Sequence, residues 1–357
     1  MSISEEFKEK VSKLIFLEFK KESIYNIFKV EVSENIYLPL RAERVIDKVK
    51  SGEKFKDIPL SFFVEGMFYV LGGDSSFKFN NIYLKILNNN KAEFMKYVKG
   101  IIVDEIKNKT YEDAYIMLKG LIEIEGTEEN FDKIMMLSET IREKKSEFQE
   151  EELVIIEKAK KLKNYANPYL YEAYIKNENK DFEGAWYCIN TYIEYGGEAT
   201  NKISEFKNSI GFIRSYEKAK AIIYDEPKES LKLFVSLLDE FEDDAILNYY
   251  IGMNYRIIGN HEKAIYYLNE AMALDSNVVE VFNELGINYA AINEYDKAIQ
   301  YMRKAFEVTK SIEICTNLIM CYLNKGDITQ AKLHYEIAKK MDSNDEIVIK
   351  LKNVFEK

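Results

Sequence analysis

The chain has 357 residues, more than the roughly 250–300 over which a single hydrophobic core grows, so it forms either two domains or an elongated repeat protein. Hydrophobic residues at 47% and charged residues at 31% are typical of a folded protein and exclude a disordered chain. The 4 prolines and 15 glycines are too few for the turns of an all-β fold, and a net charge of −11 argues against nucleic acid as the main partner.

Neither the N-terminal residues nor the apolar stretches point to export or to a membrane. Residues 1–6 lack the basic start and the apolar block of a signal peptide, and the most apolar stretch, residues 58–71, is too short to cross a bilayer. Cys188, Cys315 and Cys321 have no metal-like spacing, and they predict reduced thiols. We therefore expect a cytoplasmic protein without membrane insertion.

The first 90 residues predict a separate, mainly helical domain or cap, in which we recognise no family. The expected elements are an amphipathic helix over residues 7–19, a short strand or helix end over 27–32, helices over 40–49 and 59–71, a turn over 71–76 and a helix over 77–87. This region does not clearly join the repeats that follow it.

Residues 91–244 predict degenerate helical hairpins. Each has an apolar first helix followed by a second helix with a small residue near its start, such as Ala114 or Ala185. Pro227 is well placed to open another second helix, because proline suits the first helical turn. Between these pairs, residues 131–162 predict two longer charged helices without a small residue where they would cross.

Residues 245–344 show a clear internal repeat. Three segments align on Ala264, Ala298 and Ala331, which are 34 and 33 residues apart, and such periods are typical of stacked helical hairpins. Gly252 and Gly286 in the preceding helices leave room for two helices to cross closely.

Large apolar pairs and turn residues follow the same period. Tyr255, Tyr289 and Tyr322 each lie four residues after an apolar residue, which places both on one helical face. Gly259, Asn293 and Gly326 end the first helix of each unit, where glycine and asparagine tolerate the left-handed conformation that turns the chain.

This pattern resembles the tetratricopeptide repeat family. The resemblance implies an all-α fold, a right-handed α-solenoid of helical hairpins, divided here into residues 1–90, 91–244 and 245–357. The chain departs from the family pattern at Asn248, Phe282 and Cys315, where tryptophan is common, and residues 345–357 fit a capping helix.

In this family, the first helix of each repeat lines a concave face that binds peptides. The resemblance carries this role to nine positions: Tyr249, Met253, Arg256, Asn283, Ile287, Ala290, Thr316, Met320 and Asn324. Some members bind C-terminal carboxylates through a basic clamp. The matching positions here include Glu284 and Glu313, which argues against that use.

No catalytic motif, metal site or cofactor site is predicted. His261 and His334 lack partners at metal-ligand spacing and are expected at the surface, and the glycines of residues 72–76 lack the spacing and lysine of a phosphate loop. We therefore predict a non-enzymatic, bacterial-type scaffold that binds a protein or peptide on the concave solenoid face. The alternatives are a peptide-responsive sensor or regulator without its own DNA-binding domain, and an enzyme whose N-terminal pocket would hold carboxylates or Arg41 and Arg44.

Overall fold

The structure is a computed structural model, and it describes residues 2–50, 58–241 and 243–355, without the side chains of residues 44 and 47–49. The chain forms two compact units, Met1–Lys207 and Asn208–Lys357, and the division falls within helix α12 (Asn201–Ala221). Helices build both units, so the predicted all-α fold is confirmed. The described residues contain one small sheet, of two strands.

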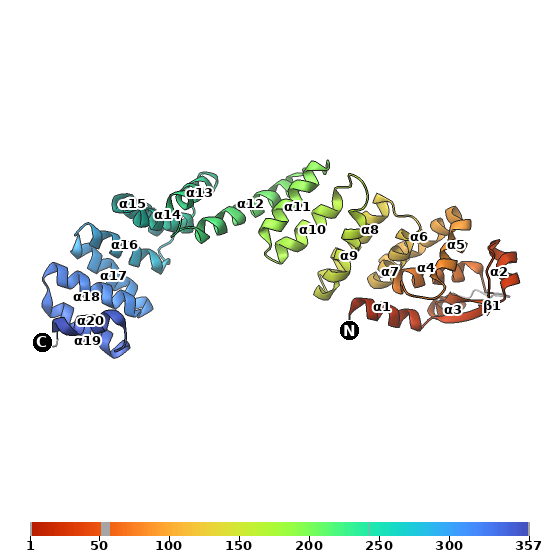
Figure 1. Ribbon diagram of the computed structural model, residues 1–357, viewed down its shortest axis with the longest axis horizontal. Helices are drawn as coiled ribbons and strands as arrows, with labels where there is room; N and C mark the ends of the chain where they lie inside the picture. The colour runs from red at the N-terminus through yellow and green to blue at the C-terminus, as the bar shows by residue number, and fades with distance from the viewer. Residues whose placement is uncertain (1, 51–57, 242, 356–357) are drawn as a thin grey trace. The chain divides into compact units, whose positions relative to one another are not determined.

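The first unit places a short sheet among its N-terminal helices and continues in helical pairs (Figure 1, red to green). Its elements before α12 are α1 (Ile3–Ser12), β1 (Ile15–Phe19), α2 (Lys21–Phe28), β2 (Ile36–Leu40), α3 (Ala42–Lys50), α4 (Leu60–Gly73), α5 (Asn80–Asn89), α6 (Lys91–Lys107), α7 (Tyr111–Ile122), α8 (Glu128–Arg142), a 3₁₀ turn (Ser146–Phe148), α9 (Gln149–Ala159), α10 (Asn167–Glu178) and α11 (Phe182–Glu194).

The N-terminal segment differs from its prediction as one long helix. The helix ends at Ser12, and residues 15–19 form β1, which pairs antiparallel with β2 in the register Leu17 opposite Leu38. The spacing of apolar residues in this segment fits a helix as well as a strand. The strand that pairs with it, β2, begins only at Ile36, so no local pattern predicts the pairing. The sequence predicts a short strand or a helix end over residues 27–32, and they contain a helix end. Helix α2 ends at Phe28, and the next residue, Lys29, is left-handed with φ of 56°.

Helix α4 is the centre of the first unit. Every residue from Phe62 to Gly73 is buried, and the helix contacts α1, α5, α6, α7 and strand β2. The described buried hydrophobic residues around it form one cluster, whose members range from Ile3 to Ile175. The predicted boundary near residue 90 therefore falls inside one hydrophobic cluster. The division into residues 1–90, 91–244 and 245–357 stays a prediction.

Gly72 and Gly73 are helical, so the turn predicted over residues 71–76 begins only at Asp74. The reason is a close helix crossing. A Cβ atom at Gly72 would overlap the carbonyl oxygen of Ile116 on α7, and one at Gly120 would overlap the carbonyl of Phe68 on α4. Glycine at these two positions lets the backbones of α4 and α7 touch.

The second unit stacks helical hairpins one after another (Figure 1, green to blue). Its elements after α12 are α13 (Pro227–Glu240), α14 (Ala245–Ile258), α15 (His261–Leu274), α16 (Val279–Ala291), α17 (Tyr295–Thr309), α18 (Ile312–Lys325), α19 (Ile328–Met341) and α20 (Glu346–Phe355). Pro227 opens α13, as predicted.

The hairpins α14–α15, α16–α17 and α18–α19 share their turns. Gly259, Asn293 and Gly326 follow the first helices with φ of 85°, 66° and 87°, as the sequence predicts. At the crossing of α14 and α15, a Cβ atom at Gly252 would lie 2.7 Å from Leu268 Cγ, so the missing side chain brings the two helices together. Helix α20 covers the end of the array by burying Val348 and Leu351 against α19.

Candidate functional site

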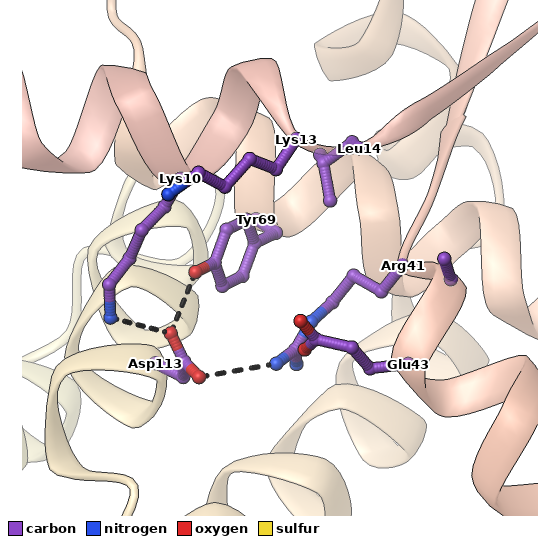
Figure 2. A pocket seen from close by; sticks show the side chains of 8 residues that line it. Lys10, Lys13, Leu14, Arg41, Glu43, Tyr69 and Asp113 are labelled. Atoms are coloured by element: carbon purple, nitrogen blue, oxygen red, sulfur yellow. Dashed lines mark hydrogen bonds and ion pairs between the residues drawn. The ribbon is translucent and has the colours of Figure 1, made fainter.

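The first unit contains a polar pocket of about 290 Å³ at the end of its sheet. Helix α1, the residues that follow β2, and helices α4 and α7 surround it. The lining residues are Lys10, Lys13, Leu14, Arg41, Ala42, Glu43, Tyr69 and Asp113. Figure 2 shows Lys10 and Arg41 reaching the carboxylate of Asp113 from opposite sides.

Arg41 organises the floor of this pocket, although only 7% of its surface is exposed. Its Nη1 atom lies 3.1 Å from Glu65 Oε1 and 2.8 Å from Glu105 Oε1, and its Nη2 atom lies 3.4 Å from Asp113 Oδ2. The guanidinium group also sits 4.7 Å from the centre of the Tyr69 ring. Because three carboxylates surround this cation, it is already neutralised.

The pKa shifts move the pocket's groups away from neutral pH. Burial raises the pKa of Asp113, but the hydrogen bond from Tyr69 and the charges of Lys10 and Arg41 outweigh burial, so the net pKa is lowered. Burial and the neighbouring Asp113 raise the pKa of the Tyr69 hydroxyl. Burial lowers the pKa of Lys10 and Arg41, but their carboxylate partners outweigh it and raise both.

A pocket that holds carboxylates and Arg41 is what the enzyme alternative requires. A general acid or base works best with a pKa near the working pH. The pKa values of all four pocket groups just described are shifted away from neutral pH. The arrangement instead fits a buried ion cluster that joins α1, β2, α4, α6 and α7. The side chain of Arg44, the other arginine named for that alternative, lies outside the described residues.

The sequence offered one signal for this cluster. Glu65 is a lone charge within the most apolar stretch of the chain, and a charged residue in such a helix is rarely buried without a partner. Its partners Arg41 and Glu105 come from distant segments, and no local pattern identifies them.

The second unit holds the predicted groove residues on α14, α16 and α18. These first helices lie in a row, since α14 contacts α16 and α16 contacts α18. Exposure differs along the row. Met320 is 44% exposed and Asn324 is exposed, whereas Thr316 is buried and its hydroxyl donates to the carbonyl of Glu313 at 2.8 Å.

The remaining groove positions are half-buried: Tyr249, Met253, Arg256, Asn283, Ile287 and Ala290. Arg256 on α14 joins α16, because its Nε atom donates to Glu284 Oε2 at 2.6 Å. Burial raises the pKa of Glu284, and Arg256 partly offsets that rise. Sequence reasoning placed Glu284 only as an obstacle to a carboxylate clamp, and its link between neighbouring repeats was missed.

His334 is buried, so its predicted surface position is wrong. Only 8% of it is exposed, its ring lies 5.0 Å from that of Tyr322, and its Nδ1 atom lies 2.9 Å from the carbonyl of Gln330. The reason is helical spacing, since His334 follows Ala331 by three residues and shares its buried face. His261 is half-buried, with Nδ1 2.9 Å from Asn288 Oδ1.

The three cysteines are free, as predicted, and all are buried. Burial raises the pKa of Cys188 to about 12, with a further contribution from Glu172, and raises those of Cys315 and Cys321 to about 11. Across the described ranges, no group of three or more histidine, cysteine, aspartate and glutamate side chains could hold a metal ion. Nor does any helix there have the length and apolarity to cross a membrane.

A stack of helical hairpins with small residues at each crossing defines an α-solenoid repeat protein. The model of the tetratricopeptide repeat matches residues 243–311, so this segment carries tetratricopeptide repeats, as its sequence pattern indicates. Repeats of this family generally serve protein interaction and not catalysis. No curated protein matches the chain.

Several solved structures are similar at low identity. A structure of YrrB, described as a tetratricopeptide repeat protein with an unusual peptide-binding site, is 19% identical and covers 56% of this chain and 97% of its own, with a TM-score of 0.41. A structure of MamA is 18% identical over 54% of this chain and 96% of its own, with a TM-score of 0.37. A tetratricopeptide repeat protein of Thermus thermophilus is 16% identical over 52% of this chain and 96% of its own, with a TM-score of 0.34.

Proposed function

We propose that this chain is an interaction scaffold that binds an extended peptide or protein segment along the first helices of its C-terminal repeats. The family match supports a binding role in general terms. The observation that carries the proposal is the row of α14, α16 and α18, whose side chains present apolar and amide groups along one line.

The exposure of these side chains indicates where a ligand makes contact. Met320 is the most exposed large apolar residue of the row, and Asn324 lies one helical turn beyond it. A flexible thioether adapts to varied apolar side chains, and an amide binds main-chain groups of an extended peptide. The α18 end of the row is therefore the part best placed to bind first.

Arg256 and Glu284 shape the α14 end of the same row. Their ion pair joins neighbouring repeats, and the side chain of Arg256 is 24% exposed. A ligand carboxylate near this point competes with Glu284 for the guanidinium group. We therefore expect apolar and uncharged segments to bind better than acidic ones.

The test uses the full chain, peptides selected from a random displayed library, and a matched pair of variants. Met320→Glu places a charge in the row, whereas Leu333→Glu places one on the second helix α19, where Leu333 is 54% exposed. Fluorescence anisotropy should show Kd rising about tenfold or more for Met320→Glu, the loss expected of an interface hot spot. Leu333→Glu should bind as the unaltered chain does. Selected peptides that bind equally to both variants would contradict the proposal.

A further inference from the structure

Among the residues that the structure describes, strand β1 of the first unit pairs along one edge only. Its partner β2 lies on one side, and the orientation of β2 shows which main-chain groups face β1. The carbonyl of Tyr37 accepts a hydrogen bond from the Tyr83 hydroxyl, and the carbonyl of Pro39 faces Gly66 of α4. Pro39 has no N–H group to donate. Tyr37 and Pro39 therefore direct their main-chain groups away from β1.

The register then fixes the orientation of β1. Hydrogen-bonded and non-hydrogen-bonded pairs alternate in an antiparallel ladder. Glu18 lies opposite Tyr37 and Phe16 opposite Pro39, so these are the non-bonded pairs. The N–H and C=O groups of Phe16 and Glu18 consequently point to the outer edge of β1, and none of the described residues forms a hydrogen bond with them there.

Two apolar side chains along this edge are partly exposed. Ile15 is 44% exposed and Leu17 is 36% exposed, although the residues opposite them on β2, Leu40 and Leu38, are almost fully buried. The core face of the sheet therefore continues past the helices that cover β2. Proteins usually protect such an edge with charges, proline or a covering element. Here Glu18 is the only charge within β1.

We propose that the outer edge of β1 binds an extended peptide strand of a partner, antiparallel to β1, which adds a third strand to the sheet. The outward groups of Phe16 and Glu18 supply main-chain hydrogen bonds, and apolar residues at alternate positions of the peptide cover Ile15 and Leu17. This is recognition by strand addition, in which main-chain bonds give affinity and alternate side chains give specificity. The site is separate from the repeat groove and does not depend on it.

Charge at the two ends of β1 defines the partner further. Lys13, which also forms an ion pair with Glu9 at 2.8 Å, precedes the strand. Lys20 and Lys21 follow it, and all three lysines are exposed. A peptide with acidic residues on both sides of its apolar positions complements them. A second copy of this chain does not complement these lysines. Antiparallel self-pairing centred on Leu17 brings Lys13 of one copy close to Lys21 of the other, and the two positive charges repel.

The probe is a synthetic peptide of alternating valine and threonine with two glutamates at each end, titrated into the full chain. In the proposed register, the valines lie opposite Ile15, Leu17 and Phe19, and the threonine amides face β1. We expect saturable binding by calorimetry. N-methylation of the threonine amides should abolish binding, whereas N-methylation of the valine amides should preserve it. Lysines in place of the glutamates should weaken binding about tenfold, since a few charge pairs change affinity by that order.

The matched variants are Glu18→Pro and Glu18→Gln. Glu18→Pro removes an N–H group that β2 does not use, so the sheet can fold while the edge loses a donor. Glu18→Gln keeps the main-chain donor. Loss of binding in Glu18→Pro with binding retained in Glu18→Gln supports the proposal. It is overturned by an unaltered chain that does not bind the peptide, by equal binding of both variants, or by indifference to which amides are methylated. If Glu18→Pro does not fold, the comparison of the two N-methylated peptides on the unaltered chain tests the proposal by itself.

Discussion

Arg41→Met should destabilise the first unit strongly. Methionine is shorter and carries no charge, so the change leaves the carboxylate of Glu105 buried beside an apolar side chain. Glu105 is 6% exposed. Breaking a buried ion pair by removing one partner costs about 3–5 kcal/mol, because a buried charge is left behind. Asp113 contributes less to this loss, since it keeps Lys10 and Tyr69.

The magnitude depends on how far other donors compensate. Glu105 keeps a hydrogen bond from the hydroxyl of Thr110. That hydroxyl carries no charge, so we expect the loss to remain about 3–5 kcal/mol at pH 7.5. Adding Glu105→Gln to Arg41→Met removes one of the buried charges and should recover part of this stability.

The loss should also depend on pH. A buried carboxyl group without a cation holds its proton more tightly in the folded chain than in the unfolded chain. The variant therefore gains stability relative to the unaltered protein as the pH falls from 7.5 to 5. Urea unfolding measures this, followed by the fluorescence of Trp186, the single tryptophan of the chain, which lies in the first unit. A loss below about 1 kcal/mol, the level of an exposed ion pair, would refute the reasoning.

Two further stability predictions follow from buried groups of the first unit. Glu152 is fully buried, and burial, partly offset by Arg142, raises its pKa from 4.5 to about 7. The folded chain thus keeps a proton that the unfolded chain releases. The unfolding free energy should therefore fall by about 3 kcal/mol as the pH rises from 4.5 to 7, as measured by urea titrations. If a Glu152→Gln variant shows the same fall, Glu152 is not its cause. Gly72→Ala should cost about 3 kcal/mol or more, because the new Cβ meets the backbone of α7. Gly100→Ala, where a Cβ meets nothing within 4 Å, should stabilise by about 0.5–1 kcal/mol; similar midpoints for the two variants would contradict the close crossing.

The sequence predicted the second unit well because its structure depends on local signals. Each hairpin needs a small residue where its helices cross and a left-handed residue where the chain turns, and Ala264 and Gly259 supply both within a few positions. Repetition at a fixed period then separates these signals from chance. The error at His334 came from treating a polar residue as exposed despite its place on the buried face.

The first unit was harder to predict because its structure depends on distant contacts. Strand β1 has a spacing of apolar residues that also fits a helix, and only its pairing with β2 decides between them. Strand β2 was missed because Pro39 lowers the strand preference of its segment. Arg41 lies between β2 and α3, and its carboxylate partners lie on three different helices, so the cluster forms only when the chain has folded.

The most direct test of the repeat groove is hydrogen–deuterium exchange of the full chain with and without a peptide selected from a displayed library. The scaffold proposal predicts slower exchange on α14, α16 and α18 when the peptide is bound, strongest around Met320. It also predicts that Met320→Glu removes this protection. Protection confined to other helices or to strand β1, with α14, α16 and α18 unchanged, would contradict binding along the first helices of the repeats.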